Sequence, residues 1–389
     1  MNREMRGVTG LSAAHLVIDL YSPVLPAVLP LLIANHGYSY LLGGLLVTAY
    51  TLTSSMAQPL IGWLFDRRGK GIHIGYSLIL SATFISFIGI APEFSILALF
   101  AMLAALGHAT FHPSALGTVG AVAHDANRGR LMSYFIVGGN LGYAIGPLLA
   151  GVVVAVLGLE GLLILLVPGY AMAFLLRYIL PGEAPGRPAP PQPNPRTQGG
   201  AIRHGPIITL LSAAGLRAWA IFAAVAYLPT YLVLQGFDLV VANTLVSLML
   251  LAGVGGQILG GTLSDRYGRK EFSVLGLALA IPAFLIFIGT KGLVSIVFMM
   301  IFGFLLWSTF AVTVAMGQEL MPGNIGLASG LTLGLAVGGG GIGVAVTGSL
   351  ADLITLETAL TLLAIPIAFS LLLFFILPYP WKYFQENSV

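Results

Sequence analysis

Residues 58–69 read QPLIGWLFDRRG, and residues 257–268 repeat them 199 positions later as QILGGTLSDRYG. The identical positions include Gln58, Gly62, Leu64, Asp66, Arg67 and Gly69 in the first copy and Gln257, Gly261, Leu263, Asp265, Arg266 and Gly268 in the second. A second set of glycines recurs 197 positions apart, with Gly129, Gly142, Gly146 and Gly151 matching Gly326, Gly339, Gly343 and Gly348. The chain therefore contains two halves built on one plan.

The composition around these repeats is strongly apolar. Of the 389 residues, 57% are hydrophobic and only 8% are charged, whereas a soluble domain carries about 25% charged residues. This composition excludes a soluble globular enzyme and indicates a chain surrounded mostly by lipid. The chain has no cysteine, which excludes disulfides, iron–sulfur clusters and thiolate chemistry.

Twelve apolar stretches reach about the 20 residues that a transmembrane helix needs. They are residues 8–34, 41–65, 72–91, 94–123, 131–157, 161–180, 206–234, 241–264, 272–290, 292–320, 327–350 and 358–378. Barrel strands would alternate in short runs, so long continuous runs favour helices. We expect an all-α membrane protein with twelve transmembrane helices in two pseudo-symmetric six-helix bundles.

The basic residues predict the orientation in the membrane. With the N-terminus inside, Lys291 lies outside and Arg217 lies within a span, so the other 15 of the 17 lysines and arginines lie inside. This bias predicts cytoplasmic termini and a multi-pass protein of the inner (plasma) membrane. The net charge of +3 follows this topology and does not indicate a nucleic-acid partner.

A proline-rich segment separates the halves. Residues 181–206 contain eight prolines, and such chain forms an extended spacer instead of a helix. We expect an N-terminal bundle over 1–182, a cytoplasmic linker over 183–205 and a C-terminal bundle over 206–389. Two six-span halves of equal orientation are typical of a secondary transporter.

The repeated segments resemble motifs of the major facilitator superfamily. Residues 62–70, GWLFDRRGK, and residues 261–270, GTLSDRYGRK, resemble that family's loop motif between the second and third spans. Residues 142–151, GYAIGPLLAG, resemble its fifth-span antiporter motif, with Ala150 where that motif prefers glycine. Residues 15–21, HLVIDLY, and the Phe-His-Pro at 111–113 resemble the fosmidomycin resistance branch, which exports a phosphonate antibiotic.

Opposite charges are expected near the middle of the bilayer. Asp19 lies about 11 residues into the first span, or roughly 16 Å at 1.5 Å per residue, and Arg217 lies at a similar depth in the seventh. Ionisable groups at such depth are costly and usually face a cavity. His15 shares a helix face with Asp19, and His108 shares one with His112, because residues four apart lie on one face.

The family resemblance implies that spans one, four, seven and ten line a central cavity. The predicted proton-coupling residues are Asp19, His15 and His112, and the predicted substrate-binding residues are Arg217, Asp19, His108, His112, Trp307, Asn140 and Tyr227. The structural alternatives are an ion pair between Asp19 and Arg217, histidines that only satisfy neighbouring polar groups, and packing for Trp307.

The charged loops are predicted to act as a conformational latch between access states. The residues concerned are Asp66, Arg67, Arg68, Asp265, Arg266 and Arg269. The alternative is a charged loop that only fixes topology. The glycines of the fifth and eleventh spans serve either close helix packing or a hinge.

We expect a secondary transporter that moves a small organic anion or drug, phosphonate-like or carboxylate, by proton-coupled alternating access. Efflux by proton antiport is the preferred mode, and proton-coupled uptake by symport is the alternative. Alternatives from other classes are a non-transporting membrane sensor and a metal-binding membrane protein. The expected partners are substrate, protons and lipid, with the chain as a monomer and without a cofactor or resident metal. No H-E-x-x-H or G-x-S-x-G motif indicates an enzyme.

Overall fold

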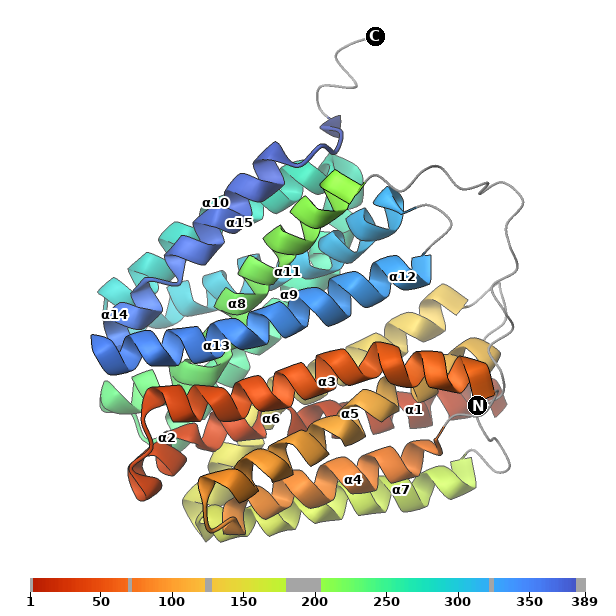
Figure 1. The fold of residues 1–389 in the computed structure, drawn as a ribbon, viewed down its shortest axis with the longest axis vertical. Coiled ribbons are helices and arrows are strands. Elements are labelled where there is room, and N and C mark those ends of the chain that lie inside the picture. The colour runs from red at the N-terminus through yellow and green to blue at the C-terminus, as the bar shows by residue number, and fades with distance from the viewer. Residues whose placement is uncertain (1–2, 69–71, 123–127, 180–203, 322–324, 383–389) are drawn as a thin grey trace. The chain divides into compact units, whose positions relative to one another are not determined.

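The computed structural model describes residues 3–68, 72–122, 128–179, 204–321 and 325–382, and no strand occurs among them. These residues form long helices joined by short connections, as Figure 1 shows. The predicted linker over 183–205 lies outside the described residues apart from its last two positions, which begin a helix.

The described elements follow one another in a simple order. They are α1 (Arg3–Tyr21), α2 (Val24–His36), α3 (Tyr40–Arg68), α4 (Ile74–Phe87), the 3₁₀ turn η1 (Ile88–Ile90), α5 (Phe94–Val122), α6 (Arg128–Leu157), the 3₁₀ segment η2 (Leu159–Leu165), α7 (Leu166–Ile179), α8 (His204–Leu234), α9 (Leu239–Tyr267), α10 (Arg269–Gly289), α11 (Gly292–Leu320), α12 (Ile325–Gly330), the π-helical turn η3 (Leu331–Leu335), α13 (Ala336–Leu353), α14 (Leu356–Thr361) and α15 (Ala364–Ile376).

The predicted spans are confirmed as helices. Within the described residues, 11 helices are long and apolar enough to cross a membrane, and a shorter apolar helix, Ile74–Ile90, occupies the place of the third predicted span. The first predicted span, 8–34, is interrupted between α1 and α2 at Ser22 and Pro23. Proline has no N–H to donate and its ring clashes with the carbonyl four residues earlier, which belongs here to Asp19.

The chain divides into two compact units. The first contains Met1–Gly37, Ala49–Gln192 and Leu232–Ser247, and the second contains Tyr38–Thr48, Pro193–Tyr231 and Leu248–Val389. Short segments of each predicted half thus cluster with the other unit, and the domain division at the linker stays a prediction.

Glycines let α6 pack directly on the backbone of α1 in the first unit. A Cβ added at any of three glycines spaced four apart would lie closer than 3 Å to a carbonyl oxygen of α1: Gly138 meets Ser12, Gly142 meets Leu16, and Gly146 meets Leu20. Contacts this short leave no room for any side chain, so this face is built for close packing.

The second unit repeats this packing between α13 and α8. An added Cβ at three glycines of α13 would lie closer than 3 Å to atoms of α8: Gly340 meets Ala218, Gly343 meets Trp219, and Gly348 meets Tyr227. In each repeat, glycines therefore bring the fifth helix of that repeat into close contact with its first helix. The π-helical turn η3 lies directly before α13, and such turns accommodate local departures from α-helical geometry.

Candidate transport site

Asp19 lies in the last turn of α1, beside the break in the first span, and three histidines surround its carboxylate. His15 Nε2 lies 3.1 Å from Asp19 Oδ2, and His108 Nε2 lies 3.1 Å from Oδ1. His112 Nε2 lies 3.5 Å from the same Oδ1. The side chain of Asp19 is 15% exposed. The structure therefore brings together the four ionisable residues that the sequence predicts in spans one and four.

The other ring nitrogens of His15 and His112 determine where their protons lie. His15 Nδ1 is 2.7 Å from the carbonyl oxygen of Phe135, and His112 Nδ1 is 3.0 Å from that of His108. A carbonyl oxygen only accepts, so both Nδ1 atoms donate. His15 Nε2 then faces a carboxylate oxygen at hydrogen-bond distance, and this contact requires a shared proton between the two atoms. This geometry is what a proton-binding cluster requires, and the proton-coupling role of His15, Asp19 and His112 stays a prediction.

His108 connects Asp19 to polar side chains of α3. Its Nδ1 lies 2.8 Å from Ser54 Oγ, which itself accepts from Gln58 Nε2 at 3.4 Å. Because the carboxylate oxygen of Asp19 only accepts, His108 Nε2 carries a proton. In the neutral ring, His108 Nδ1 then accepts the hydroxyl proton of Ser54. Ser54 and Gln58 come from α3 and extend the network beyond the residues predicted from sequence.

Gly139 of α6 forms the wall against which the cluster rests. An added Cβ there would lie 2.5 Å or less from atoms of both His15 and Asp19. The ring of His15 stacks on Phe135, one turn earlier on α6, with 4.1 Å between ring centroids. Gly139 is outside the four-residue glycine repeat, and the space that the cluster needs explains why glycine occupies this position.

Arg217 lies in α8, in the second unit, and is 2% exposed. Its Nη1 donates to Thr309 Oγ1 at 3.0 Å and to Thr313 Oγ1 at 2.9 Å. Both hydroxyls donate their own protons to carbonyl oxygens of α11, so they can only accept from the guanidinium. The guanidinium carbon lies 5.2 Å from the centre of the Phe310 ring.

The charge of Arg217 is not neutralised within its own unit. No ion pair joins it to a described carboxylate of that unit, and its buried Nε has no hydrogen-bond partner among the described residues. A buried cation without a counter-ion is costly. The guanidinium can therefore still receive an anion. The predicted approach of Arg217 to Asp19, which belongs to the first unit, stays a prediction.

The remaining predicted cavity residues lie in different surroundings. Trp307 packs against Gly253, where an added Cβ would lie 2.9 Å from the indole. The hydroxyl of Tyr227 donates to the carbonyl oxygen of Tyr40 at 2.8 Å. Asn140 is half-buried on α6. Their roles in substrate binding stay predictions.

The predicted latch of the second half forms an ion network. Arg269 Nη1 lies 3.0 Å from Asp265 Oδ1, and Arg269 Nε lies 2.7 Å from Glu319 Oε1. Glu319 also accepts a hydrogen bond from the hydroxyl of Tyr379. Lys382 Nζ donates to the carbonyl oxygens of Asp265 and Arg266 at 3.1 and 2.8 Å. The chain after α15 therefore binds the last turn of α9.

The latch of the first half is described only in part. The guanidinium of Arg67 lies 4.6 Å from the centre of the Trp63 ring, and the side chains of Asp66 and Arg68 lie outside the described residues. The latch role of both loops stays a prediction.

The histidine cluster also has the composition of a metal site. His15, Asp19 and His112 each offer one ligand atom, and these atoms lie within 4.8 Å of one another. Imidazole nitrogen and carboxylate oxygen bind Zn²⁺. Hydrogen bonds from Nδ1–H to carbonyl oxygens fix the tautomer and orientation of histidines that bind a metal through Nε2. The metal-binding alternative predicted from the sequence rests on this donor set.

Comparison with known proteins identifies relatives over most of the chain. The family model described as Major Facilitator Superfamily matches residues 11–342. The Fosmidomycin resistance protein of Escherichia coli (strain K12) is 28% identical over 366 residues, covering 90% of this chain and 88% of that protein. The MFS-type transporter YfnC of Bacillus subtilis (strain 168) is 30% identical over 348 residues, covering 87% and 84%.

Solved structures share the fold. A bacterial homologue of the human lysosomal transporter Spinster, in an inward-facing and unoccupied conformation, has a TM-score of 0.82 at 17% identity and covers 100% of this chain and 98% of that one. A mutant of the nucleoside transporter NupG has a TM-score of 0.76 at 13% identity, covering 97% and 100%. The prediction of an all-α membrane protein with this fold is confirmed, and the chain belongs to the major facilitator superfamily.

Proposed function

We propose that this chain is a proton-coupled secondary transporter that exports a small organic anion or drug by proton antiport. The observation that carries the proposal is the 3.1 Å contact between His15 Nε2 and Asp19 Oδ2. Because His15 Nδ1 donates to the carbonyl oxygen of Phe135, this contact needs a proton on one of its two atoms. The similarity to a protein named for fosmidomycin resistance supports export of a phosphonate-like compound. Orientation with both termini in the cytoplasm, in the inner membrane of a bacterial cell, is part of this proposal.

Arg217 is the proposed substrate anchor. Its guanidinium is buried, retains an unpartnered Nε and has no carboxylate partner among the described residues of its unit. A guanidinium binds a phosphonate or carboxylate through two parallel N–H bonds. An anionic substrate would therefore supply the missing counter-charge, and the ring of Phe310 would cover one face of the guanidinium.

Coupling is proposed to act through the access state. A ligand shifts a conformational equilibrium only by binding one state more tightly than the other. In antiport, a proton on the Asp19 cluster favours one access state and an anion on Arg217 favours the other. Binding of the anion therefore promotes release of the proton, and binding of the proton promotes release of the anion. In the symport alternative, the anion on Arg217 and the proton on the Asp19 cluster favour the same access state, so both are carried in the same direction.

Transport in proteoliposomes under an imposed pH gradient tests this proposal, with fosmidomycin as the probe. Antiport predicts that an acidic side drives the probe to accumulate on that side, whereas symport predicts accumulation on the opposite side. The Asp19→Asn variant should abolish this accumulation and keep counterflow of the probe. Glu160→Gln is the matched control, because Glu160 is an exposed carboxylate in η2, away from the cluster.

A membrane sensor would bind the probe and show no counterflow in any variant. Accumulation that survives unchanged in Asp19→Asn would contradict the assignment of the proton site, even if transport itself were observed.

A further inference from the structure

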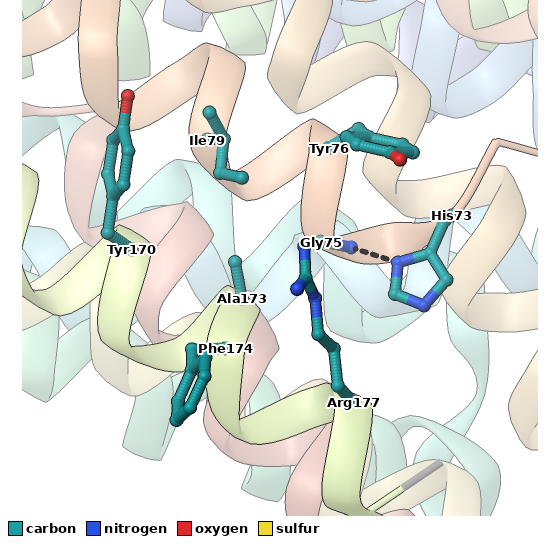
Figure 2. A pocket seen from close by; sticks show the side chains of 8 residues that line it. All are labelled: His73, Gly75, Tyr76, Ile79, Tyr170, Ala173, Phe174 and Arg177. Atoms are coloured by element: carbon teal, nitrogen blue, oxygen red, sulfur yellow. Dashed lines mark hydrogen bonds between the residues drawn. The ribbon is translucent and has the colours of Figure 1, made fainter. Parts of the chain in front are cut away.

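A groove with a volume of about 430 Å³ lies between α4 and α7 of the first unit (Figure 2). It is lined by His73, Gly75, Tyr76, Ile79, Tyr170, Ala173, Phe174 and Arg177. None of the proposed transport residues lines it, so the groove requires a separate explanation.

Small residues form the floor of the groove and aromatic residues form its walls. An added Cβ at Gly75 would lie 3.5 Å from the carbonyl oxygen of Ala173, so the two helices approach closely there. Tyr76, Tyr170 and Phe174 are 63%, 45% and 59% exposed. In a membrane-spanning protein, such aromatic side chains contact lipid near the interface. The walls therefore suit an acyl chain.

One end of the groove is positively charged. Arg177 extends from α7 toward the first turn of α4, beside Gly75 and His73, as Figure 2 shows. It is exposed and forms no hydrogen bond or ion pair with any described residue. No aspartate or glutamate lines the groove. This end therefore has an unpaired cation and no competing anion.

His73 adds a second donor at this end. Its Nδ1 accepts the backbone N–H of Gly75 at 3.1 Å, so the ring proton lies on Nε2. The polar end thus offers N–H donors from two helices, which is the complement of a phosphate group. Along α7, Arg177 and Tyr170 are seven residues apart, or roughly 10 Å at 1.5 Å per residue, so a headgroup and the first part of its acyl chain span this distance.

We propose that this groove binds an anionic phospholipid, with the phosphate on Arg177 and His73 and one acyl chain along Phe174 and Tyr170. Basic pockets between transmembrane helices bind anionic lipid headgroups in this way. The polar end of the groove lies where the third span begins and the sixth span ends. In the predicted topology, both of these ends lie on the same side of the membrane as the N-terminus. The cytoplasmic leaflet, which is rich in anionic lipid, is the expected source.

Native mass spectrometry of the full-length protein, titrated with phosphatidylglycerol or phosphatidylcholine, tests the proposal. We expect one phosphatidylglycerol to bind at least tenfold more tightly than phosphatidylcholine. The Arg177→Gln variant should lose this preference, because a charge-assisted phosphate contact contributes about tenfold or more in affinity. Arg177→Lys should keep part of it, since the charge remains. Arg6→Gln is the matched control, because Arg6 is an exposed arginine of α1.

Equal loss of affinity in the Arg177→Gln and Arg6→Gln variants would overturn the proposal, because it would indicate a general surface charge effect. Equal binding of the two lipids would overturn it as well. In the same titration with inorganic phosphate, phosphate binding without a preference for phosphatidylglycerol would indicate an anion site that does not bind lipid, and would also overturn the proposal. None of these results depends on transport activity.

Discussion

Replacing Gly139 with alanine tests the packing that holds His15 against Asp19. The added methyl carbon would lie 2.3 Å from His15 Nε2 and 2.5 Å from Asp19 Oδ2, distances at which atoms cannot remain. Either α6 moves away from α1, or His15 rotates and loses its bonds to Asp19 and Phe135.

The expected loss of unfolding free energy has two parts. Overpacking a close helix interface costs about 1–3 kcal/mol, and loss of a hydrogen bond to a charged group costs about 1.5–3 kcal/mol. We therefore expect a destabilisation of about 2.5–6 kcal/mol for Gly139→Ala. Gly339→Ala is the matched control, because no atom lies within 4 Å of an added Cβ there. Alanine at that site should be neutral or stabilise the helix by up to about 1 kcal/mol.

Reversible unfolding in mixed micelles measures both variants, alone and combined with His15→Ala. Removing the imidazole makes room for the added methyl group, so the cost of Gly139→Ala should fall by at least about 1.5 kcal/mol in the His15→Ala background. A Gly139→Ala variant as stable as the wild type would refute this reasoning. An equal cost with and without the imidazole would show that the methyl group does not meet His15.

Three further predictions follow from the same contacts. Arg217→Lys should raise the half-saturating concentration of an anionic substrate at least about tenfold, since lysine cannot form two parallel bonds; an unchanged value in a transport assay would contradict the anchor role. Added Zn²⁺ should leave the melting temperature unchanged, because the proposed proton between His15 and Asp19 occupies the place of a metal. If Zn²⁺ did bind, a concentration of 100 times its Kd would stabilise the folded protein by about 2.7 kcal/mol. Burial and the adjacent Glu319 raise the pKa of Tyr379, so its phenol remains a hydrogen-bond donor at neutral pH. Tyr379→Phe should change the unfolding free energy by less than about 1 kcal/mol but should alter the transport rate if the charged loop is a latch. An unchanged transport rate would leave this loop only a topological role.

The parts of the fold that sequence predicts well are local. Continuous apolar runs predict helices because lipid leaves the backbone no other partner, and the spacing of His15 from Asp19 predicts a shared face because it depends only on helical geometry. The break after α1 is a partial miss: Pro23 signals it, but a hydropathy pattern treats the whole run as one span.

The parts of the site that sequence does not predict depend on contacts between distant helices. Ser54 supports His108, and Phe135 fixes the proton of His15, yet each is an ordinary residue of its own span. Four of the five residues at 51–55 carry a hydroxyl group, and this cluster in an apolar helix is the one signal that indicates a polar face there. Thr309 and Thr313 share a face of α11, but nothing in their spacing identifies Arg217 as their partner.

The most direct test of proton coupling counts the protons that leave the purified protein when substrate binds, using a pH indicator in weakly buffered detergent solution. Antiport through the Asp19 cluster predicts release of a proton from the wild type when fosmidomycin binds, and none from Asp19→Asn at matched saturation. The same release from both proteins, or none from the wild type, would contradict the account.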